Sequence, residues 1–597
     1  MEHQAANLHE LVSDLILDTK GSAEGLVSFA ADSSVALFLP EIILCLTILA
    51  ILFLRLFRFG QRLDMFFVAL LGSLAALATI APWRLGDPQA AITSRELFTG
   101  LLVYDSFAVF VRGLLFGFAI LFVIFTRLSG IPNRYDSADV YTLILGATLG
   151  LCLMSTANHL LMVFMGIEMA SVPSYALAAV RKRDRRGTEA ALKFAVFGAG
   201  AAGIMLYGIS LLAGLFQTVH LPTLAHRMAT LLPSMGTGEL MVAALAGLFI
   251  MVGLAYKLSA FPFHYWAPDV FEGAPAEIGA FLSVASKAAA LALVVRIVVG
   301  IGTTEATFAQ RTQAPTTTAA VTDAELPEWS LVNLTSDDHE AAPKGPHHGA
   351  PEKPHTEVVG DGLGTVRSFM ARLIALIAVV TCTFGNLAAY GQRNIKRMLA
   401  YSTISHAGFM MMAIPGLLAA APVDRSVAES AISGLSIYLA IYVFMNLGAF
   451  AVVAFLRNAM GSEEIDDYAG LLRRSPLVAI CFSLILFSLI GIPPFAGFIG
   501  KLAVLAALVD AFRVTGEAYL MWVVVIGVIN TAIALVYYLR VARIMTMLPE
   551  PETRTPFSVS PFALSTVYVV LMTIPNAFLI IGWDGLHRMA QAASHLF

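Results

Sequence analysis

Residues 241–301 read MVAALAGLFIMVGLAYKLSAFPFHYWAPDVFEGAPAEIGAFLSVASKAAALALVVRIVVGI, and this stretch decides the fold. Two apolar runs, each long enough to cross a bilayer, flank a segment broken around Pro262. One run contains Lys257 and the other contains Lys287. Lys287 is about 14 Å along the helix from the nearest charge on either side, so its ammonium cannot reach water by extending along the helix. A charge at the centre of a span costs about 2.5–3.5 kcal/mol or more. We therefore expect both lysines to face protein or internal water.

The composition is that of an integral membrane protein. Of 597 residues, 58% are hydrophobic and 13% are charged. The four cysteines fall singly within apolar runs without a CxxC spacing, so neither an iron–sulfur cluster nor a disulfide framework is expected. Residues 1–34 are acidic and lack a basic n-region, so we expect no cleaved signal peptide.

Long apolar runs recur along the whole chain. They predict an all-α integral membrane protein with about 14 transmembrane helices, of which spans 7 and 12 are broken. The predicted spans run roughly 35–57, 65–82, 103–126, 140–157, 159–180, 190–215, 240–261, 276–300, 369–390, 394–414, 430–457, 476–510, 518–545 and 562–582.

Lysine and arginine are concentrated in the loops that follow odd-numbered spans, and the densest run is Arg181–Arg186. Positive loops stay in the cytoplasm. We therefore expect the odd loops there, and both termini and the long loop 301–368 on the opposite side. Residues 1–34 contain a predicted amphipathic helix at 8–18, which suits a membrane or partner surface.

The segment 301–368 differs from the rest in composition. It is rich in Thr, Pro and His and has too few apolar residues to pack a core, so we predict a disordered insert. Its four histidines match no recognisable metal-site spacing. They are His339, His347, His348 and His355.

Two halves of the chain follow the same plan. Spans 4–8 (140–300) and spans 9–13 (369–545) each contain one interrupted span, broken at Ser259–His264 and at Gly491–Gly497. Paired interruptions indicate inverted repeats, and five spans per half require opposite orientations. Spans 1–3 (35–139) precede the repeats, and span 14 with the C-terminal segment (546–597) follows them.

Six ionisable residues lie within the predicted spans, and such residues usually mark pathways for ions or protons. They are Glu168, Lys193, Lys257, Lys287, His406 and Lys501. Structural interpretations stay open: Glu168 could hydrogen-bond near the Pro173 kink, Lys193 could extend to the cytoplasmic face, and His406 could be a satisfied core group. Burial favours the neutral form of a lysine and a nearby carboxylate favours the charged form. A row of such groups therefore predicts a proton relay with water-filled gaps.

The same residues lie in stretches that resemble the antiporter-like membrane subunits of respiratory complex I, the proton-pumping NADH:quinone oxidoreductase. The stretches are GIEMASVPSYAL around Glu168, EAALKFAVFGA around Lys193, GLAYKLSAFPFHYWAPDVFEGAP around Lys257, ASKAAAL around Lys287, RNIKRMLAYSTISHAGF around His406 and GIPPFAGFIGK ending in Lys501. The likeness covers about 35–545 except the insert, which is longer than the family's usual connection. Sister subunits usually have a glutamate in place of Lys501, and the largest adds a long lateral helix. A chain ending at Phe597 is expected to belong to the branch with the lysine.

The resemblance implies a fold of fourteen helices and a proton channel in the membrane arm of the complex, in a bacterial inner membrane. Glu168 and Lys257 would be the controlling pair, Lys193 and Lys287 the central relay, and Lys501 the exit. No cofactor is expected in this chain, and NADH, FMN, iron–sulfur clusters and quinone are implied in partner subunits. The expected partners are other membrane-arm subunits, including sister antiporter-like subunits, and the lipid bilayer. No nucleic acid partner is expected.

Two other functions stay open. A subunit of a multisubunit cation/proton antiporter would need a carboxylate-rich ion site, whereas only Glu168 is a clear mid-span acid. A structural scaffold of the membrane arm would pump nothing and use its lysines only for packing. If the relay exists, Lys501 follows a break that should be wet. We therefore expect Lys501→Glu to be tolerated better than Lys501→Ala.

Overall fold

The computed structural model describes residues 33–57, 63–85, 92–133, 136–181, 184–302, 363–551, 560–579 and 581–595. The predicted helix at 8–18 and most of the predicted insert, with its four histidines, lie outside these residues.

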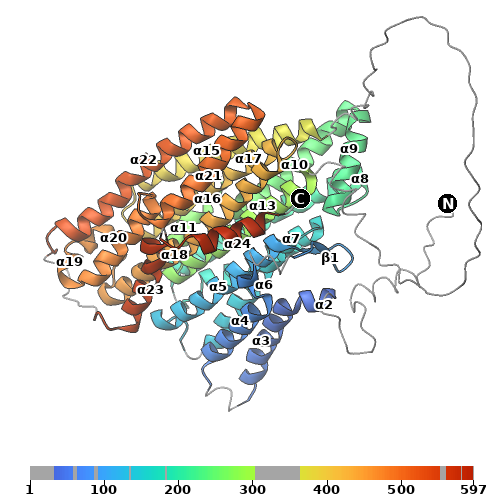
Figure 1. Cartoon of the computed structure of the whole chain (residues 1–597). Helices are drawn as coiled ribbons and strands as arrows, with labels where there is room; N and C mark the ends of the chain where they lie inside the picture. The colour runs from blue at the N-terminus through green and yellow to red at the C-terminus, as the bar shows by residue number, and fades with distance from the viewer. Residues whose placement is uncertain are drawn as a thin grey trace, which may run out of the picture.

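Each of the fourteen predicted spans contains a helix (Figure 1). The helices are α3 (Leu39–Arg55), α4 (Met65–Ile80), α5 (Ser106–Ser129), α6 (Ser137–Thr156), α7 (Leu160–Ala178), α8 (Arg185–Phe216), α10 (Thr237–Leu258), α12 (Ala276–Ser283) with α13 (Ala285–Gly302), α15 (Gly364–Ala389), α16 (Ile395–Met411) with α17 (Ala413–Ala420), α18 (Arg425–Met460), α20 (Pro476–Ile490) with α21 (Ala496–Thr515), α22 (Ala518–Met547) and α23 (Leu564–Phe578). Among the described residues, 11 helical segments are long and apolar enough to cross a membrane. The prediction of a helical, multi-pass membrane protein is confirmed.

Several short elements were not predicted. They are α2 (Ser34–Leu37), α9 (Leu221–Leu231), α11 (Trp266–Gly273), α19 (Leu471–Arg474), α24 (Asp584–Ser594), the 3-10 turns η2 (Pro82–Arg84), η3 (Leu232–Ser234) and η4 (Ile465–Tyr468), and the strands β1 (Arg95–Leu97) and β2 (Leu102–Tyr104). The two strands form an antiparallel hairpin. Strands of three residues are too short to show an alternating pattern in the sequence, so this small hairpin could not be predicted.

Connections that follow odd-numbered spans meet on one side of the bundle. Asn458, at the end of span 11, donates to the Ser129 carbonyl after span 3 at 2.8 Å, and Asn394 after span 9 pairs with Glu464. On the opposite side His159 pairs with His220, which joins the loops after spans 4 and 6. We name these two sides the odd face and the even face. This alternation agrees with the predicted order of spans.

The helices at the centre of the bundle are almost wholly buried. They are α12 with α13, α16 with α17, and α18. Outer helices such as α4, α10 and α22 leave most of their residues at least partly exposed, as a surface facing lipid requires. In Figure 1, α3 and α4 lie at one edge of the bundle and α22 at the opposite edge. Ionisable side chains on the central helices are therefore shielded from lipid.

Both predicted helix breaks are present. The helix α10 ends at Leu258 and the chain resumes as α11, and α20 ends at Ile490 before α21 begins. Left-handed residues terminate the first helix of each pair: Ser259 has a φ of 57° and Gly491 a φ of 83°. Carbonyls near these ends have no partner within their own helix, and the site is built on them.

Candidate functional site

Lys287 binds the end of α10 at the first helix break. Its side chain is wholly buried, and its ammonium donates to the Lys257 carbonyl at 3.1 Å and to Ser259 Oγ at 2.5 Å. The ammonium also lies 5.2 Å from the centre of the Trp266 ring, at the start of α11. A cation is favourable at the C-terminal end of a helix. The broken helix therefore supplies the hydrogen bonds that a buried lysine needs.

Lys501 binds the end of α20 at the second helix break in the same way. Its ammonium donates to the carbonyls of Ile490 at 2.8 Å and Leu489 at 3.3 Å, at the end of α20. It lies 5.3 Å from the centre of the Phe409 ring. Each half of the molecule thus places one buried ammonium on the carbonyl end of its broken helix, beside an aromatic ring.

His406 lies between these lysines in a cluster of hydroxyl groups. Its Nδ1 is 2.7 Å from the Tyr438 hydroxyl and its Nε2 is 3.3 Å from the Tyr538 hydroxyl. The Tyr538 hydroxyl also bonds Ser402 Oγ. All four side chains are buried. Imidazole and hydroxyl groups can each accept and donate a proton, so this cluster can conduct protons in either direction.

A second group of hydroxyls lies between Lys287 and His406. Ser283 Oγ is 2.8 Å from Thr403 Oγ1 and 3.1 Å from the Tyr442 hydroxyl. Ser283 precedes Lys287 by about one helical turn, and Thr403 precedes His406 by a similar step. Within the described residues no direct hydrogen bond joins the two groups, so water would have to connect them.

Glu168 and Lys257 face each other across α7 and α10 without a direct ion pair between these two described residues. The Lys257 ammonium instead donates to Ser171 Oγ at 2.9 Å, and Ser171 lies one turn after Glu168. Lys257 is buried, whereas Glu168 is half-buried near the surface of the bundle. The Ser171 hydroxyl therefore lies beside the predicted controlling pair, Glu168 and Lys257.

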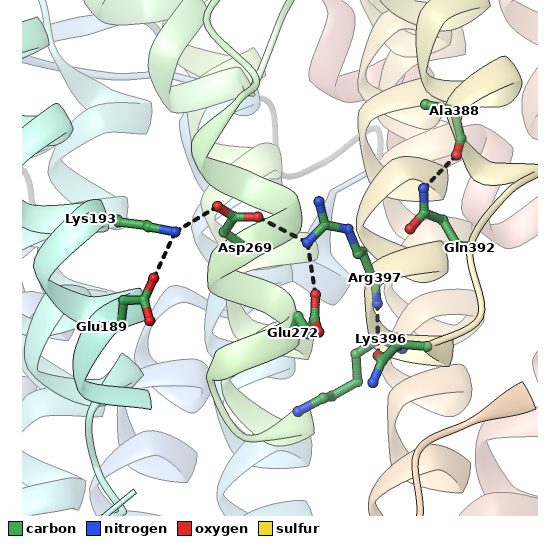
Figure 2. Close-up of polar contacts among 9 residues, drawn as sticks. Glu189, Lys193, Asp269, Glu272, Ala388, Gln392, Lys396 and Arg397 are labelled. Carbon is green, nitrogen blue, oxygen red and sulfur yellow. Dashed lines mark hydrogen bonds and ion pairs between the residues drawn. The ribbon is translucent and has the colours of Figure 1, made fainter. Parts of the chain in front are cut away.

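Lys193 does not join the buried groups. Its side chain is 39% exposed and pairs with Glu189 and Asp269, each at 3.0 Å. Asp269 also binds Arg397 at 2.9 Å, and Arg397 binds Glu272 at 2.7 Å. Figure 2 shows Asp269 of α11 between Lys193 and Arg397, which links α8 of the first half to α16 of the second. Lys193 therefore lies outside the row of buried groups and is held by two carboxylates.

Two buried ion pairs were not predicted from the sequence. Arg112 of α5 donates to Glu41 of α3, with one bond of 2.7 Å, and both side chains are almost wholly buried. Arg296 of α13 binds Asp105 through two bonds, one of 2.6 Å, and donates to the Ser155 carbonyl at 2.9 Å. Arg112 lies well inside the predicted span 103–126, and a charged residue at that position could have indicated a buried ion pair.

The described residues hold no group of three or more His, Cys, Asp and Glu side chains suited to a metal ion. The arrangement is instead a row of buried amines, hydroxyls and one imidazole, anchored on two helix breaks. Amines, hydroxyls and imidazole are each able to gain and lose a proton.

Comparison with known proteins defines the class first. The family described as "NADH:quinone oxidoreductase/Mrp antiporter, TM" matches residues 157–311 and 362–534. A chain of the Mrp complex from Dietzia sp. DQ12-45-1b has the same fold, with a TM-score of 0.68 at 17% identity over 94% of this chain and 97% of that one. A chain of respiratory complex I from Thermus thermophilus matches with a TM-score of 0.64 at 26% identity, over 92% of this chain and 98% of the other.

Similar sequences identify the branch of this family to which the chain belongs. NADH-quinone oxidoreductase subunit N of Anaeromyxobacter sp. (strain Fw109-5) is 34% identical over 94% of this chain and 96% of its own. A subunit N of Sorangium cellulosum (strain So ce56) is 35% identical over 94% of this chain and 98% of its own. The chain therefore belongs to the NADH-quinone oxidoreductase subunit N family, and the predicted resemblance is confirmed.

Proposed function

We propose that this chain is the proton-translocating subunit N of a multisubunit NADH:quinone oxidoreductase, in the membrane arm of that complex. NADH oxidation and quinone reduction take place in partner subunits, and sister antiporter-like subunits are among its neighbours. The chain lies in a bacterial inner membrane with the odd face in the cytoplasm and both termini in the periplasm, since positive residues favour that orientation.

The observation that supports pumping most directly is the central row of buried groups. Lys257, Lys287 and Lys501 lie at the two helix breaks, and His406 lies in a cluster of buried hydroxyl groups. Burying ionisable groups inside a membrane protein is costly, and such groups usually mark a pathway for ions or protons. A proton passing along the row moves from one amine or imidazole to the next through hydroxyls and water.

The roles of the predicted residues follow from this arrangement. Glu168 at the edge of the row biases Lys257, and a proton shifts between Lys257 and Lys287, which already share the carbonyl end of α10. His406 carries the proton across the centre, and Lys501 releases it. Lys193 acts from outside the row, through its ion pair with Asp269.

The test uses the complete complex, purified with its native partners and placed in sealed vesicles. Lys287→Met removes the ammonium and keeps an unbranched apolar chain. We expect the complex to assemble and oxidise NADH while proton uptake, followed with a pH-sensitive dye, falls relative to electron transfer. Ser210→Ala is the control, because Ser210 is exposed on α8 and bonds only the Tyr207 carbonyl.

Other outcomes separate the alternative functions. An unchanged ratio of protons to electrons in the Lys287 variant would identify the chain as a structural scaffold. Sodium-dependent proton flux without NADH would identify a cation/proton antiporter. A variant that fails to assemble is replaced by Lys287→Arg, which keeps the charge and tests whether a group that does not titrate supports pumping.

A further inference from the structure

Glu277 is a buried carboxylate that the relay above does not use. It lies in the first turn of α12 with no exposed surface, and neither of its carboxylate oxygens has a hydrogen-bond partner among the described residues. Burying a carboxylate without a partner is strongly unfavourable. The first turn of a helix favours a negative charge there, but it does not explain why an acid occupies this position.

The charged groups near Glu277 are engaged elsewhere or face a cavity. Arg181 and Lys396 carry the positive charges that act on it. The Lys396 ammonium is held by the Ala274 carbonyl and by Glu463, each at 2.9 Å. The Ser129 hydroxyl lies close enough to act on the Glu277 carboxylate, but its one proton is donated to the Thr126 carbonyl at 3.1 Å. The Glu277 carboxylate therefore lies near positive charges but forms no ion pair with them among the described residues.

A cavity of about 660 Å³ lies on the odd face, next to these neighbours. Its wall includes Ser129 and Arg181, which are also neighbours of Glu277, together with Asp136, Asp184 and Asn458. The lining is mostly polar, and the volume is large enough for many water molecules. Glu277 thus lies behind the wall of a water-accessible cavity on the face predicted to be cytoplasmic.

Further buried polar groups lead inward from Glu277. Asn446 of α18 is wholly buried, its amide forms no hydrogen bond of normal geometry with the described residues, and the Tyr442 side chain is its polar neighbour. Asn446 lies one turn from Tyr442, whose hydroxyl is 3.1 Å from Ser283 Oγ. Ser283 lies six residues after Glu277 on the same helix, about 9 Å along its axis. The helices α12 and α18 pack against each other, so these groups follow one interface.

We propose that Glu277 is the proton-uptake residue of this subunit. Its carboxylate takes a proton from cavity water and becomes a carboxylic acid. It then gives that proton to water held by Asn446, and the hydroxyls of Tyr442, Ser283 and Thr403 each accept one proton while donating their own. The proton ends on the Lys287 amine or the His406 imidazole. This role depends on the proposed function, because it supplies the proton that the central row moves.

The experiment compares Glu277→Gln, Glu277→Asp and Glu239→Gln in the complete complex in vesicles. Glu239 is the matched control, since it is exposed at the start of α10 on the even face and, among the described residues, accepts a hydrogen bond only from the Gly236 amide. We expect Glu277→Gln to lower coupled proton uptake roughly tenfold or more. Glu277→Asp should restore part of it, and Glu239→Gln should leave it unchanged. The infrared band of a buried carboxylic acid should appear during turnover and be missing in Glu277→Gln.

Measuring Lys287→Met in parallel keeps the two proposals separate. If Lys287→Met lowers proton uptake and Glu277→Gln does not, Glu277 is not the uptake residue and the proposed function stands. If neither variant changes uptake, both proposals fail. If both Glu277 variants prevent assembly, Glu277 is structural and the proposal is overturned. The proposal is also overturned if Glu277→Asp restores no proton uptake and the infrared band persists in Glu277→Gln.

Discussion

The Lys287 ammonium lies 3.1 Å from the backbone carbonyl of Lys257, so one buried lysine is anchored on the helix end that carries the other. The two side chains are thereby held at the same break, and the charge of each affects the proton affinity of the other. Ser259 completes the anchor with a 2.5 Å bond.

This anchor predicts the effect of Ser259→Ala. A hydrogen bond to a charged group is worth about 1.5–3 kcal/mol, so its loss should destabilise protonated Lys287 and lower the pH at which pumping is half-maximal. The measurement is proton uptake against pH for the complex in vesicles. An unchanged pH profile, with Ser210→Ala as reference, would show that Ser259 does not hold the ammonium.

Glu168→Gln should leave the complex assembled and lower pumping, because it removes the negative charge that favours protonated Lys257. Glu168 lies one turn from Ser171, the residue that Lys257 binds at 2.9 Å, and no direct ion pair is broken by the change. The effect should therefore appear in protons per electron rather than in stability. A normal ratio would remove Glu168 from its controlling role, and Glu239→Gln serves as control.

The contacts of Lys501 reverse one expectation from the sequence. Lys501 donates to two carbonyls at the end of α20, where a carboxylate would meet negative helix charge. We now predict that Lys501→Glu is no better than Lys501→Ala, and that both strongly lower coupled proton uptake without preventing assembly. Proton uptake of the glutamate variant close to the wild-type value would show that the position needs any titratable group.

Gly491→Ala tests the contact between Lys501 and the end of α20, because Gly491 is the residue that terminates α20. Gly491 has a φ of 83°, and a side chain there would come within 2.9 Å of Lys501 Cδ. Gly516, at the end of α21, has a φ of 70° and open space around it. Both substitutions carry the backbone cost of about 1–2 kcal/mol. Only Gly491→Ala should lower proton uptake, and an equal effect of both would assign the loss to strain alone.

Asp105→Asn should destabilise the subunit. Asparagine still caps α5, but Arg296 would keep a buried charge without its partner, which costs about 3–5 kcal/mol. Asp510→Asn is the control, because the Asp510–Arg513 pair is exposed and its loss costs about 0–1 kcal/mol. Thermal unfolding of the purified complex, read as release of this chain, measures both. Equal midpoints would contradict a stabilising role for the buried pair.

Much of this protein could be predicted from local sequence. Apolar runs of sufficient length specify the fourteen spans, because the bilayer requires about twenty apolar residues per helix. The motifs around Pro262 and Gly491 specify the two breaks, because proline and glycine act on the backbone beside them. The lysines within the spans were visible because a charge in an apolar run is costly wherever the helix packs. Each of these signals lies within one stretch of chain.

The partners of those charges were decided by the tertiary structure. Only folding brings Ser171 to Lys257, Asp269 to Lys193 and Asp105 to Arg296, because each pair joins helices that are far apart in the sequence. The periodicity of a single helix does not record which neighbour lies against it. For the same reason the sequence assigned no role to Glu277, and only the packed bundle places it behind a polar cavity, without a hydrogen-bond partner among the described residues.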